Sequence, residues 1–289
     1  MLIPDEDSLG TLEEELLAEE VQSGARIVPQ SEVMRSQGGE RARWYDAAHE
    51  ELLNFKHRGV FAPPTRAERE LAYPLPMKCV WALKKDGRRR CRAVVCGNFQ
   101  SKNTQELVYT AQVDISTLLA VLRLAAWSGW QVCTVDISAA FLYADLPQDS
   151  PPVLVWAPKA WKDLGLEVEC DVWVLSKALY GLRAAPRAWS IHRDAKLKEL
   201  VFQSSDNECW LEQNPVDKCL WHIRGVNNKF SGFMVTHVDD LLIISRSKPS
   251  PRIFQLFSAD LNLFVKVMDL SLHINENSLI RSSRKQVRR

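Results

Sequence analysis

Two adjacent carboxylates, Asp239 and Asp240, interrupt an otherwise apolar stretch of the chain. Apolar runs at 233–235 and 241–244 flank the pair. Because β-branched and aromatic residues favour strands, the stretch predicts a hairpin with the two aspartates at its tip. Carboxylates held between buried strands repel each other and are costly to bury without a cation. The pair therefore predicts a divalent-metal site, and a solvated turn, in which Asp is common, is the alternative.

A third carboxylate, Asp136, ends another apolar run at 132–135 and is followed by small residues that could turn into a helix. A lone Asp at a strand end is common and carries little information by itself. Together with the hairpin it gains weight, because three carboxylates could share metal ions. Only the fold can bring Asp136 next to Asp239, since the two are far apart in the sequence.

A basic ribbon is predicted upstream, where strands at 79–83 and 92–96 are joined at Asp86-Gly87, a favoured turn pair. Six cations gather in and around this turn: Lys84, Lys85, Arg88, Arg89, Arg90 and Arg92. Such a cluster is either a solvated face or a phosphate-binding surface. Arg suits phosphate because its planar fork can donate two parallel hydrogen bonds.

Helical and strand patterns supply the elements that must position these groups. Helices are expected from Arg41 with a stop at Gly59, over 113–127 with Asp114 or Ser116 as cap, and from Pro186 onward to Leu200. Further strands are expected at 153–155, 172–175, 209–211 and 220–223. Residues 253–264 suggest a helix, 270–274 a weak strand, and the last residues a basic tail.

Length and composition set the bounds on this reading. The 289 residues are 46% hydrophobic and 25% charged, so the chain can bury a sizeable core, and its length suits about two domains. The net charge of +1 excludes a protein that coats nucleic acid through an overall basic surface. Seven cysteines without a C-x-x-C pair argue against zinc and disulfides and for a cytoplasmic or nuclear location. Neither a signal peptide nor a membrane span is expected. The acidic residues 1–40 are expected to form a disordered tail.

Three motifs resemble the successive palm motifs of copia-type LTR retrotransposon reverse transcriptases. They are VDISAAFL at 135–142, LSKALYGLRAAPRAW at 175–189 and HVDDLLI at 237–243. The resemblance runs from about Trp44 to about Met268. It implies an α+β, right-hand polymerase fold with fingers and palm over 41–268, in which a ferredoxin-like antiparallel palm sheet carries helices on one face. A truncated segment at 269–289 would leave the thumb short or absent.

The resemblance also implies roles for individual residues. Asp136, Asp239 and Asp240 would be the catalytic residues and would hold two Mg²⁺ ions, with Mn²⁺ as an alternative. Phe141 would exclude a ribose 2′-hydroxyl, although an ordinary core Phe is the equal alternative. The residues expected to bind the nucleotide are Lys84, Lys85, Arg92, Ile137, Ser138, Ala139, Ala140, Phe141, Tyr180 and Gly181. Those expected to contact primer and template are His237, Val238, Arg183 and Pro186.

The chain departs from the family pattern at three positions, where Cys96, Ala184 and His237 replace the usual Lys, Gln and Tyr. The implied function is RNA-directed DNA polymerisation on an RNA or DNA template. Its partners would be a primer-template, deoxynucleoside triphosphates and other parts of a Pol polyprotein, with no membrane. A decayed or repurposed nucleic-acid-binding remnant and an unrelated metal-binding α/β protein are the two alternatives.

Overall fold

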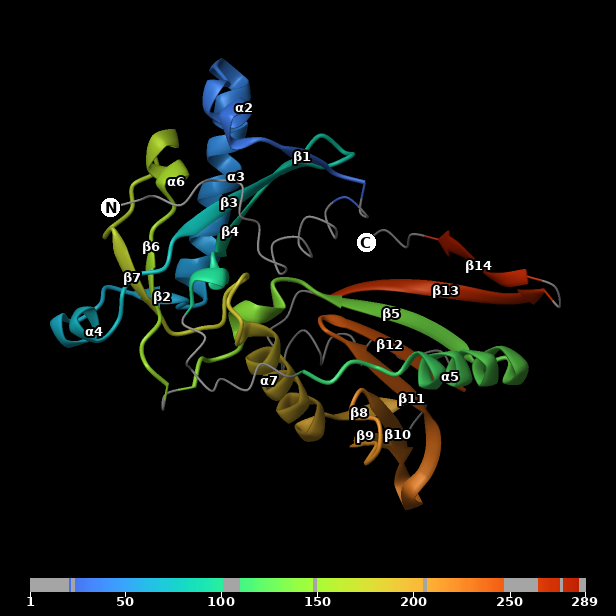
Figure 1. Ribbon diagram of the computed structural model, residues 1–289. Helices are drawn as coiled ribbons and strands as arrows, with labels where there is room; N and C mark the ends of the chain where they lie inside the picture. The colour runs from blue at the N-terminus through green and yellow to red at the C-terminus, as the bar shows by residue number, and fades with distance from the viewer. Residues whose placement is uncertain are drawn as a thin grey trace. The chain divides into compact units, whose positions relative to one another are not determined.

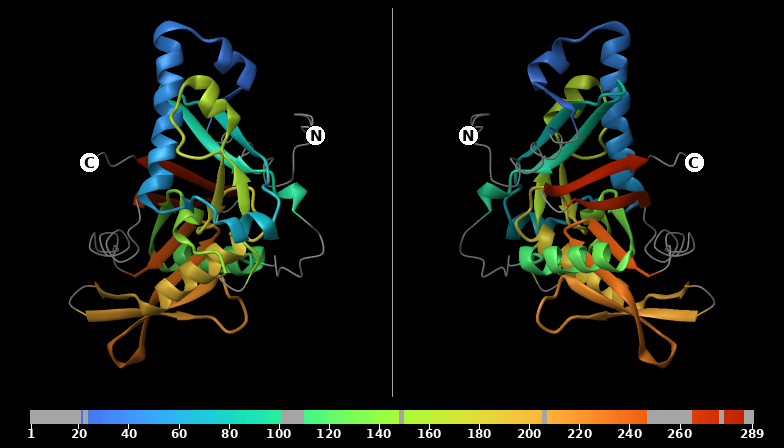
Figure 2. Two further views of the ribbon diagram at one scale, coloured as in Figure 1. Left: turned by 90° about the vertical axis from the view of Figure 1, so that its left-hand side faces the viewer. Right: turned by 90° about the vertical axis from the view of Figure 1, so that its right-hand side faces the viewer.

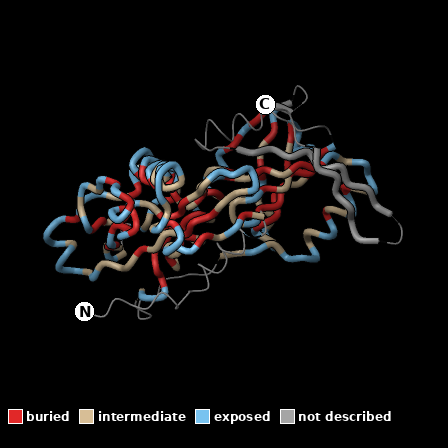
Figure 3. Tube along the Cα trace, turned by 90° about the horizontal axis from the view of Figure 1, so that it is seen from above, coloured by how far each residue is buried: buried red, intermediate tan, exposed pale blue. Residues whose placement is uncertain are grey.

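The computed structural model describes residues 21, 24–100, 110–147, 150–202 and 208–246, and the backbone of 203–204, 207, 265–275 and 278–285. Helices and three sheets make a mixed α and β structure in which all paired strands are antiparallel (Figure 1). The chain divides into two compact units: unit 1 comprises 1–108 and 141–188, and unit 2 comprises 109–140 and 189–289. Buried residues concentrate on the strands and on one side of the helices (Figure 3).

Unit 1 contains two three-stranded sheets, with strand orders β1-β3-β4 and β2-β7-β6. Its strands are β1 (Arg26–Val28), β2 (Phe61–Ala62), β3 (Met77–Leu83), β4 (Arg89–Val95), β6 (Leu154–Trp156) and β7 (Val172–Leu175). Its helices are α2 (Gln30–Arg35), α3 (Gly38–His57), α4 (Arg66–Leu71), the 3₁₀ helix η1 (Gly97–Phe99) and α6 (Lys159–Leu164).

Aromatic side chains fill the core of unit 1. The long helix α3 packs along β4 (Figures 1 and 2), and its Trp44 ring meets the Trp81 ring edge-on at 5.8 Å between centroids. Phe61 of β2 stacks on Trp173 of β7 at 4.0 Å. Ring contacts therefore join α3 to the first sheet and add to the pairing of the two-residue strand β2 with β7 in the second.

Residues 26–40 were expected to belong to a disordered tail, but they form β1, α2 and the start of α3. Val28 is buried and pairs with Trp81 at the edge of β3, and Val33 of α2 is fully buried. These few apolar residues are enough to order the segment because they find partners in a sheet that is far away in the sequence. Residues 1–20 lie outside the described part of the chain.

Unit 2 is built on one eight-stranded sheet with the order β14-β13-β5-β12-β11-β10-β9-β8. Its strands are β5 (Gln131–Ile137), β8 (Val201–Ser204), β9 (Asn207–Gln213), β10 (Leu220–Gly225), β11 (Lys229–His237), β12 (Asp240–Ser245), β13 (Val265–Asn275) and β14 (Ser278–Lys285). It also holds α5 (Ile115–Ser128) and the 3₁₀ helix η3 (Val226–Asn228). Two elements cross the boundary between the units: the 3₁₀ helix η2 (Ala140–Tyr143) and α7 (Ala185–Glu199).

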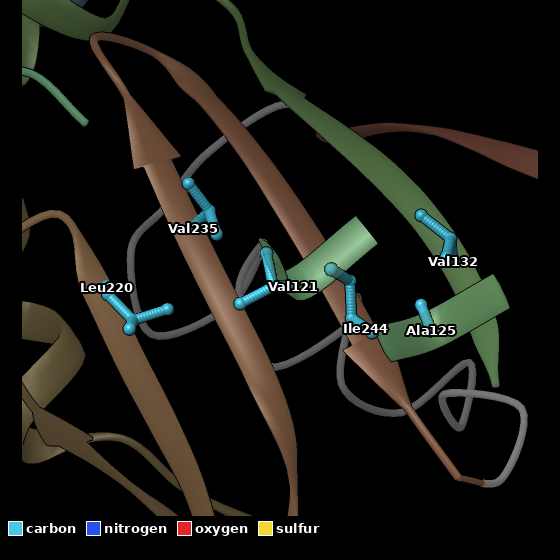
Figure 4. Close-up of a cluster of buried hydrophobic side chains, with 6 residues drawn as sticks. All are labelled: Val121, Ala125, Val132, Leu220, Val235 and Ile244. Atoms are coloured by element: carbon cyan, nitrogen blue, oxygen red, sulfur yellow. The ribbon is translucent and has the colours of Figure 1, made fainter. Parts of the chain in front are cut away.

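One face of this sheet is covered by α5. Asp114 caps the helix by accepting a hydrogen bond from the Ser116 amide at 2.7 Å, and Gly129 ends it with a φ of 64°. The side chains that form the contact come from the helix and from four strands (Figure 4): Val121, Ala125, Val132, Leu220, Val235 and Ile244. Leu118 and Leu122 pack against this cluster as partly buried side chains, whereas Leu119 is 38% exposed.

The element predictions hold for most long segments. The helix from Arg41, the hairpin at 233–244 and the strands at 172–175, 209–211 and 220–223 are all present. The predicted helix at 253–264 lies outside the described residues. In the described part of the chain, no helix has the length and apolar character needed to cross a membrane. None of the seven cysteines, all of which lie in the described part of the chain, forms a disulfide.

Candidate active site

The predicted Asp-Asp hairpin is confirmed, with β11 and β12 as its strands. His237 pairs with Asp240, so Val238 and Asp239 form a two-residue turn. Such turns need a positive φ at their first residue and normally place Gly or Asn there. Here Val238 adopts a φ of 50°. A left-handed backbone costs a residue with a Cβ about 1–2 kcal/mol, so this turn is strained.

Three hydrogen bonds hold the two carbonyls of this turn. The Val238 carbonyl accepts from the indole Nε1 of Trp189 at 2.7 Å and from Nη1 of Arg193 at 3.0 Å. The Asp239 carbonyl accepts from the backbone amide of Ile137 at 3.1 Å. The last bond attaches the turn to the end of β5. Ile137 was expected to bind the nucleotide, and in the structure its amide makes this attachment.

The sheet brings Asp136 to the hairpin. Strand β5 lies next to β12, and Asp136 is the direct cross-strand partner of Asp240. Directly opposed residues of an antiparallel pair share a face, with Cβ atoms about 4.5–5.5 Å apart. Asp239 precedes Asp240 in the turn. The backbone of all three aspartates thus lies at one end of two neighbouring strands, although the partner of Asp136 in the ladder is Asp240 and not Asp239.

The donor chemistry of this end of the sheet fits a hard divalent cation, because Mg²⁺ prefers carboxylate oxygens and two opposed carboxylates repel each other without one. The three aspartate side chains, however, do not converge on one point. Among the described residues, no three His, Cys, Asp or Glu side chains converge closely enough to hold a metal ion. The predicted role of the three aspartates as shared metal ligands stays a prediction.

The segment after Asp136 is a turn and not the expected start of an α-helix. Ser138 and Ala139 form the turn, with Ala139 at a φ of 57°, and the 3₁₀ helix η2 follows from Ala140. A 3₁₀ helix of this length offers only a few backbone N–H groups. The predicted phosphate contacts of Ser138, Ala139 and Ala140 are not tested by this geometry.

In unit 1, three residues predicted to bind the nucleotide meet. The rings of Phe141 and Tyr180 pack edge to face at 5.3 Å between centroids. The guanidinium carbon of Arg92 lies 5.1 Å from the centroid of the Tyr180 ring. Arg92 is only 6% exposed. The buried guanidinium therefore makes a cation–π interaction with the Tyr180 ring of this aromatic pair. Such an interaction stabilises by about 0.5–2 kcal/mol where it is desolvated.

Gly181 follows Tyr180 and has a packing role of its own. It adopts a φ of 86°, and a Cβ built on it would lie 1.9 Å from the Val95 carbonyl oxygen of β4. The amide of Val95 donates to the Tyr180 carbonyl at 2.8 Å. A Cβ on Gly97 would in turn lie 2.1 Å from the Gly181 carbonyl oxygen. The two glycines let the Tyr180 loop approach β4 at backbone distance.

The basic ribbon forms as predicted, but several of its cations are engaged within the chain. Arg89 contacts Glu40 of α3 through Nε and Nη2, and Arg88 pairs with Asp86 at 2.7 Å. Lys84 closes the turn by donating its amide to the Arg88 carbonyl. The exposed Lys85 extends to within contact of Gly24. The expectation that this ribbon opposes the carboxylates stays a prediction.

The four predicted primer and template residues belong to two segments. His237 is exposed and Val238 partly buried at the hairpin tip, whereas the Arg183 amide donates to Oε1 of Gln100 at 3.1 Å. Pro186 lies in the first turn of α7, where no N–H donor is required. Their contacts with nucleic acid stay predictions.

Glu51 of α3 is a partly buried carboxyl group that the sequence did not reveal. Its Oε1 accepts a bond from the Ala93 amide at 3.4 Å, on the strand that carries Arg92. Burial raises the pKa of Glu51 to about 7, although the Ala93 amide and Arg92 oppose the shift. The only signal in the sequence would have been a Glu on the buried side of the α3 pattern.

The comparisons with known proteins identify a family and several relatives. The family described as reverse transcriptase (RNA-dependent DNA polymerase) matches residues 69–253. A retrovirus-related Pol polyprotein from transposon TNT 1-94 of Nicotiana tabacum is 30% identical over 60% of this chain. The transposon Ty1-DR4 Gag-Pol polyprotein of Saccharomyces cerevisiae is 25% identical over 72% of it. The chain spans only about 12% of the length of each of these relatives.

Proposed function

Because the chain belongs to the reverse transcriptase family, as its copia-type motifs predicted, we propose that it extends a DNA primer on an RNA or DNA template. The observation that carries this proposal is the register of β5 and β12, which sets Asp136 opposite Asp240 and beside Asp239. Carboxylates at this place would hold two divalent ions, Mg²⁺ or Mn²⁺. When bound, such ions neutralise the charge that develops as the primer 3′-oxygen displaces pyrophosphate.

The residues of unit 1 would receive the incoming deoxynucleoside triphosphate. The Phe141 ring, held by Tyr180 and Arg92, would stand where a ribose 2′-hydroxyl would otherwise fit. Lys84 and Lys85 in the ribbon would contact the triphosphate. His237 at the hairpin tip would support the primer. Each of these assignments combines a family motif with a position in the structure.

In terms of fold, we assign the sheet of unit 2 to a palm and the β3–β4 ribbon to the fingers of a right-hand polymerase. A reduced thumb remains part of this proposal, whereas the expected boundaries at 41 and 268 fall inside α3 and β13. The Pol polyprotein names of the relatives support a role beside other parts of such a polyprotein. A cytoplasmic or nuclear location is supported by the seven cysteines, none of which forms a disulfide in the described part of the chain.

Primer extension on an RNA template with Mg²⁺ tests the proposed function. Asp239→Asn should reduce extension at least about 100-fold, because a lost metal ligand removes several kcal/mol of transition-state stabilisation. Asp163→Asn, an exposed carboxylate on α6, is the matched control and should retain activity. Nucleic-acid binding without any extension by the wild type would refute polymerisation and identify a decayed remnant.

A further inference from the structure

The Val238 carbonyl is the meeting point of two buried donors from α7, and we propose that Trp189 and Arg193 are positioning residues that hold the catalytic turn in its strained conformation. This inference rests on the proposed function only for the role of Asp239. The contacts themselves belong to unit 2, which contains the turn, β5 and α7 from Trp189 onward. Neither residue would touch substrate or metal; both would act through the backbone of the turn.

The conformation of Val238 needs an external cause. Its φ of 50° is rare for any residue with a Cβ and is an outlier for a β-branched one. A turn with Gly at this place would adopt the same backbone without strain, but the hairpin tip from His237 to Asp240 contains no Gly. Strained backbone persists only where surrounding contacts determine it.

Those contacts are the two hydrogen bonds from α7. The Trp189 indole and the Arg193 guanidinium are 1% and 3% exposed, so both donors are in the protein interior. The residues are four apart and therefore lie on one face of the helix. Their bonds to the Val238 oxygen measure 2.7 and 3.0 Å and use both acceptor positions of that carbonyl.

Arg193 is itself held in place. Its Nε and Nη2 donate to Oδ1 of Asp194 at 3.0 and 2.8 Å. The other oxygen of Asp194 accepts from Nε2 of Gln213 on β9 at 2.9 Å. Because the guanidinium is fixed on one side by this carboxylate, its remaining donor is aimed at Val238. A buried Arg in such a network is costly to displace.

These contacts fix the orientation of Asp239. The peptide plane before it is fixed by Trp189 and Arg193 through the Val238 oxygen, and the plane after it by the Ile137 amide through its own carbonyl. The direction of the Asp239 side chain is therefore set from both sides. Without the α7 donors, Val238 can relax to a negative φ, and Asp239 turns with it.

Trp189→Phe tests the proposal because it removes the donor and keeps most of the ring. Trp221→Phe is the matched control: Trp221 is buried in β10 of the same unit, and its indole nitrogen has no hydrogen-bond partner among the described residues. Two quantities are measured in each variant of the full chain. They are the hydrogen-exchange rate of the Asp240 amide and the kcat and KM for a deoxynucleotide in primer extension.

In Trp189→Phe we expect Asp240 exchange to accelerate about 10-fold and kcat to fall about 10-fold with an unchanged KM, as the loss of one hydrogen bond of this kind predicts. Trp221→Phe should change neither quantity more than about twofold. Adding Val238→Gly to Trp189→Phe should restore most of kcat, because Gly accepts the positive φ without support. A purely structural Trp would not be rescued in this way.

Unchanged exchange at Asp240 in Trp189→Phe, or a kcat loss that Val238→Gly does not restore, would overturn the proposal. Arg193→Met in place of Trp189→Phe must give the same pattern, and an opposite result there would overturn it as well. A wild type without polymerase activity would refute the proposed function instead. In that case the exchange comparison alone decides whether α7 holds the turn.

Discussion

Gly181→Ala isolates the close approach between the Tyr180 loop and β4. The new Cβ would lie 1.9 Å from the Val95 carbonyl oxygen, and the φ of 86° is unfavourable for Ala. The left-handed backbone costs about 1–2 kcal/mol, the steric displacement about 1–3 kcal/mol, and loss of the Val95–Tyr180 hydrogen bond about 0.5–1.5 kcal/mol. We therefore expect the free energy of unfolding to fall by about 3–6 kcal/mol.

Gly87→Ala is the matched control for this substitution. Gly87 has a nearly equal φ of 82°, and within the described part of the chain a Cβ there would meet no atom within 4 Å. Its cost should be the backbone cost alone, about 1–2 kcal/mol. Urea unfolding followed by circular dichroism gives both values, and hydrogen exchange of the Val95 amide reports the local change. Equal destabilisation by the two substitutions would refute the reasoning, because the loop would then be free to move away from β4.

Three further predictions concern the candidate site. Phe141→Val should raise ribonucleotide incorporation at least about 10-fold with a modest loss of deoxynucleotide incorporation. If matched single-nucleotide assays show an unchanged preference for deoxynucleotides over ribonucleotides, Phe141 is an ordinary core residue. Arg92→Ala should raise the KM for the deoxynucleotide by a larger factor than the Kd for primer-template. Fluorescence anisotropy measures that Kd, and a weaker primer-template affinity with an unchanged KM would contradict the prediction. Because the pKa of Glu51 rises to about 7 on folding, the folded state binds the extra proton, and stability falls as pH rises between about 4.5 and 7. Glu51→Gln should therefore gain up to about 3 kcal/mol relative to wild type between pH 5 and pH 8, while exposed Glu50→Gln shows no such change in urea midpoints.

The long elements were predictable because their residues carry the pattern within one segment. The Asp114 cap and the Gly129 stop delimit α5 to within two residues of its predicted bounds. The short helix α4 was missed, although Thr65 and Glu68 form a reciprocal capping box that the sequence displays. β1 and α2 carried no comparable signal, since their order depends on the remote β3.

The candidate site was predictable in residue identity but not in geometry. Motif resemblance pointed to Asp136 and the Asp pair, but no local pattern specifies that Asp240 is the ladder partner of Asp136. The left-handed Val238 could not be foreseen either, because propensity argues against it. Its support comes from Trp189 and Arg193, which lie on another element. Register and strain of this kind arise from tertiary contacts.

The division of the chain into interleaved units has a consequence for biosynthesis. The polypeptide passes from one unit to the other after Val108, Ala140 and Ala188. Unit 1 can complete its core only once residue 188 has left the ribosome. Strand β5 can pair with β12 only after about a hundred further residues have been synthesised. Until then β5 is an apolar strand with open edges, a template for aggregation. Neither unit can be produced by a single truncation, so isolating either one would require rejoining segments that are separate in the sequence.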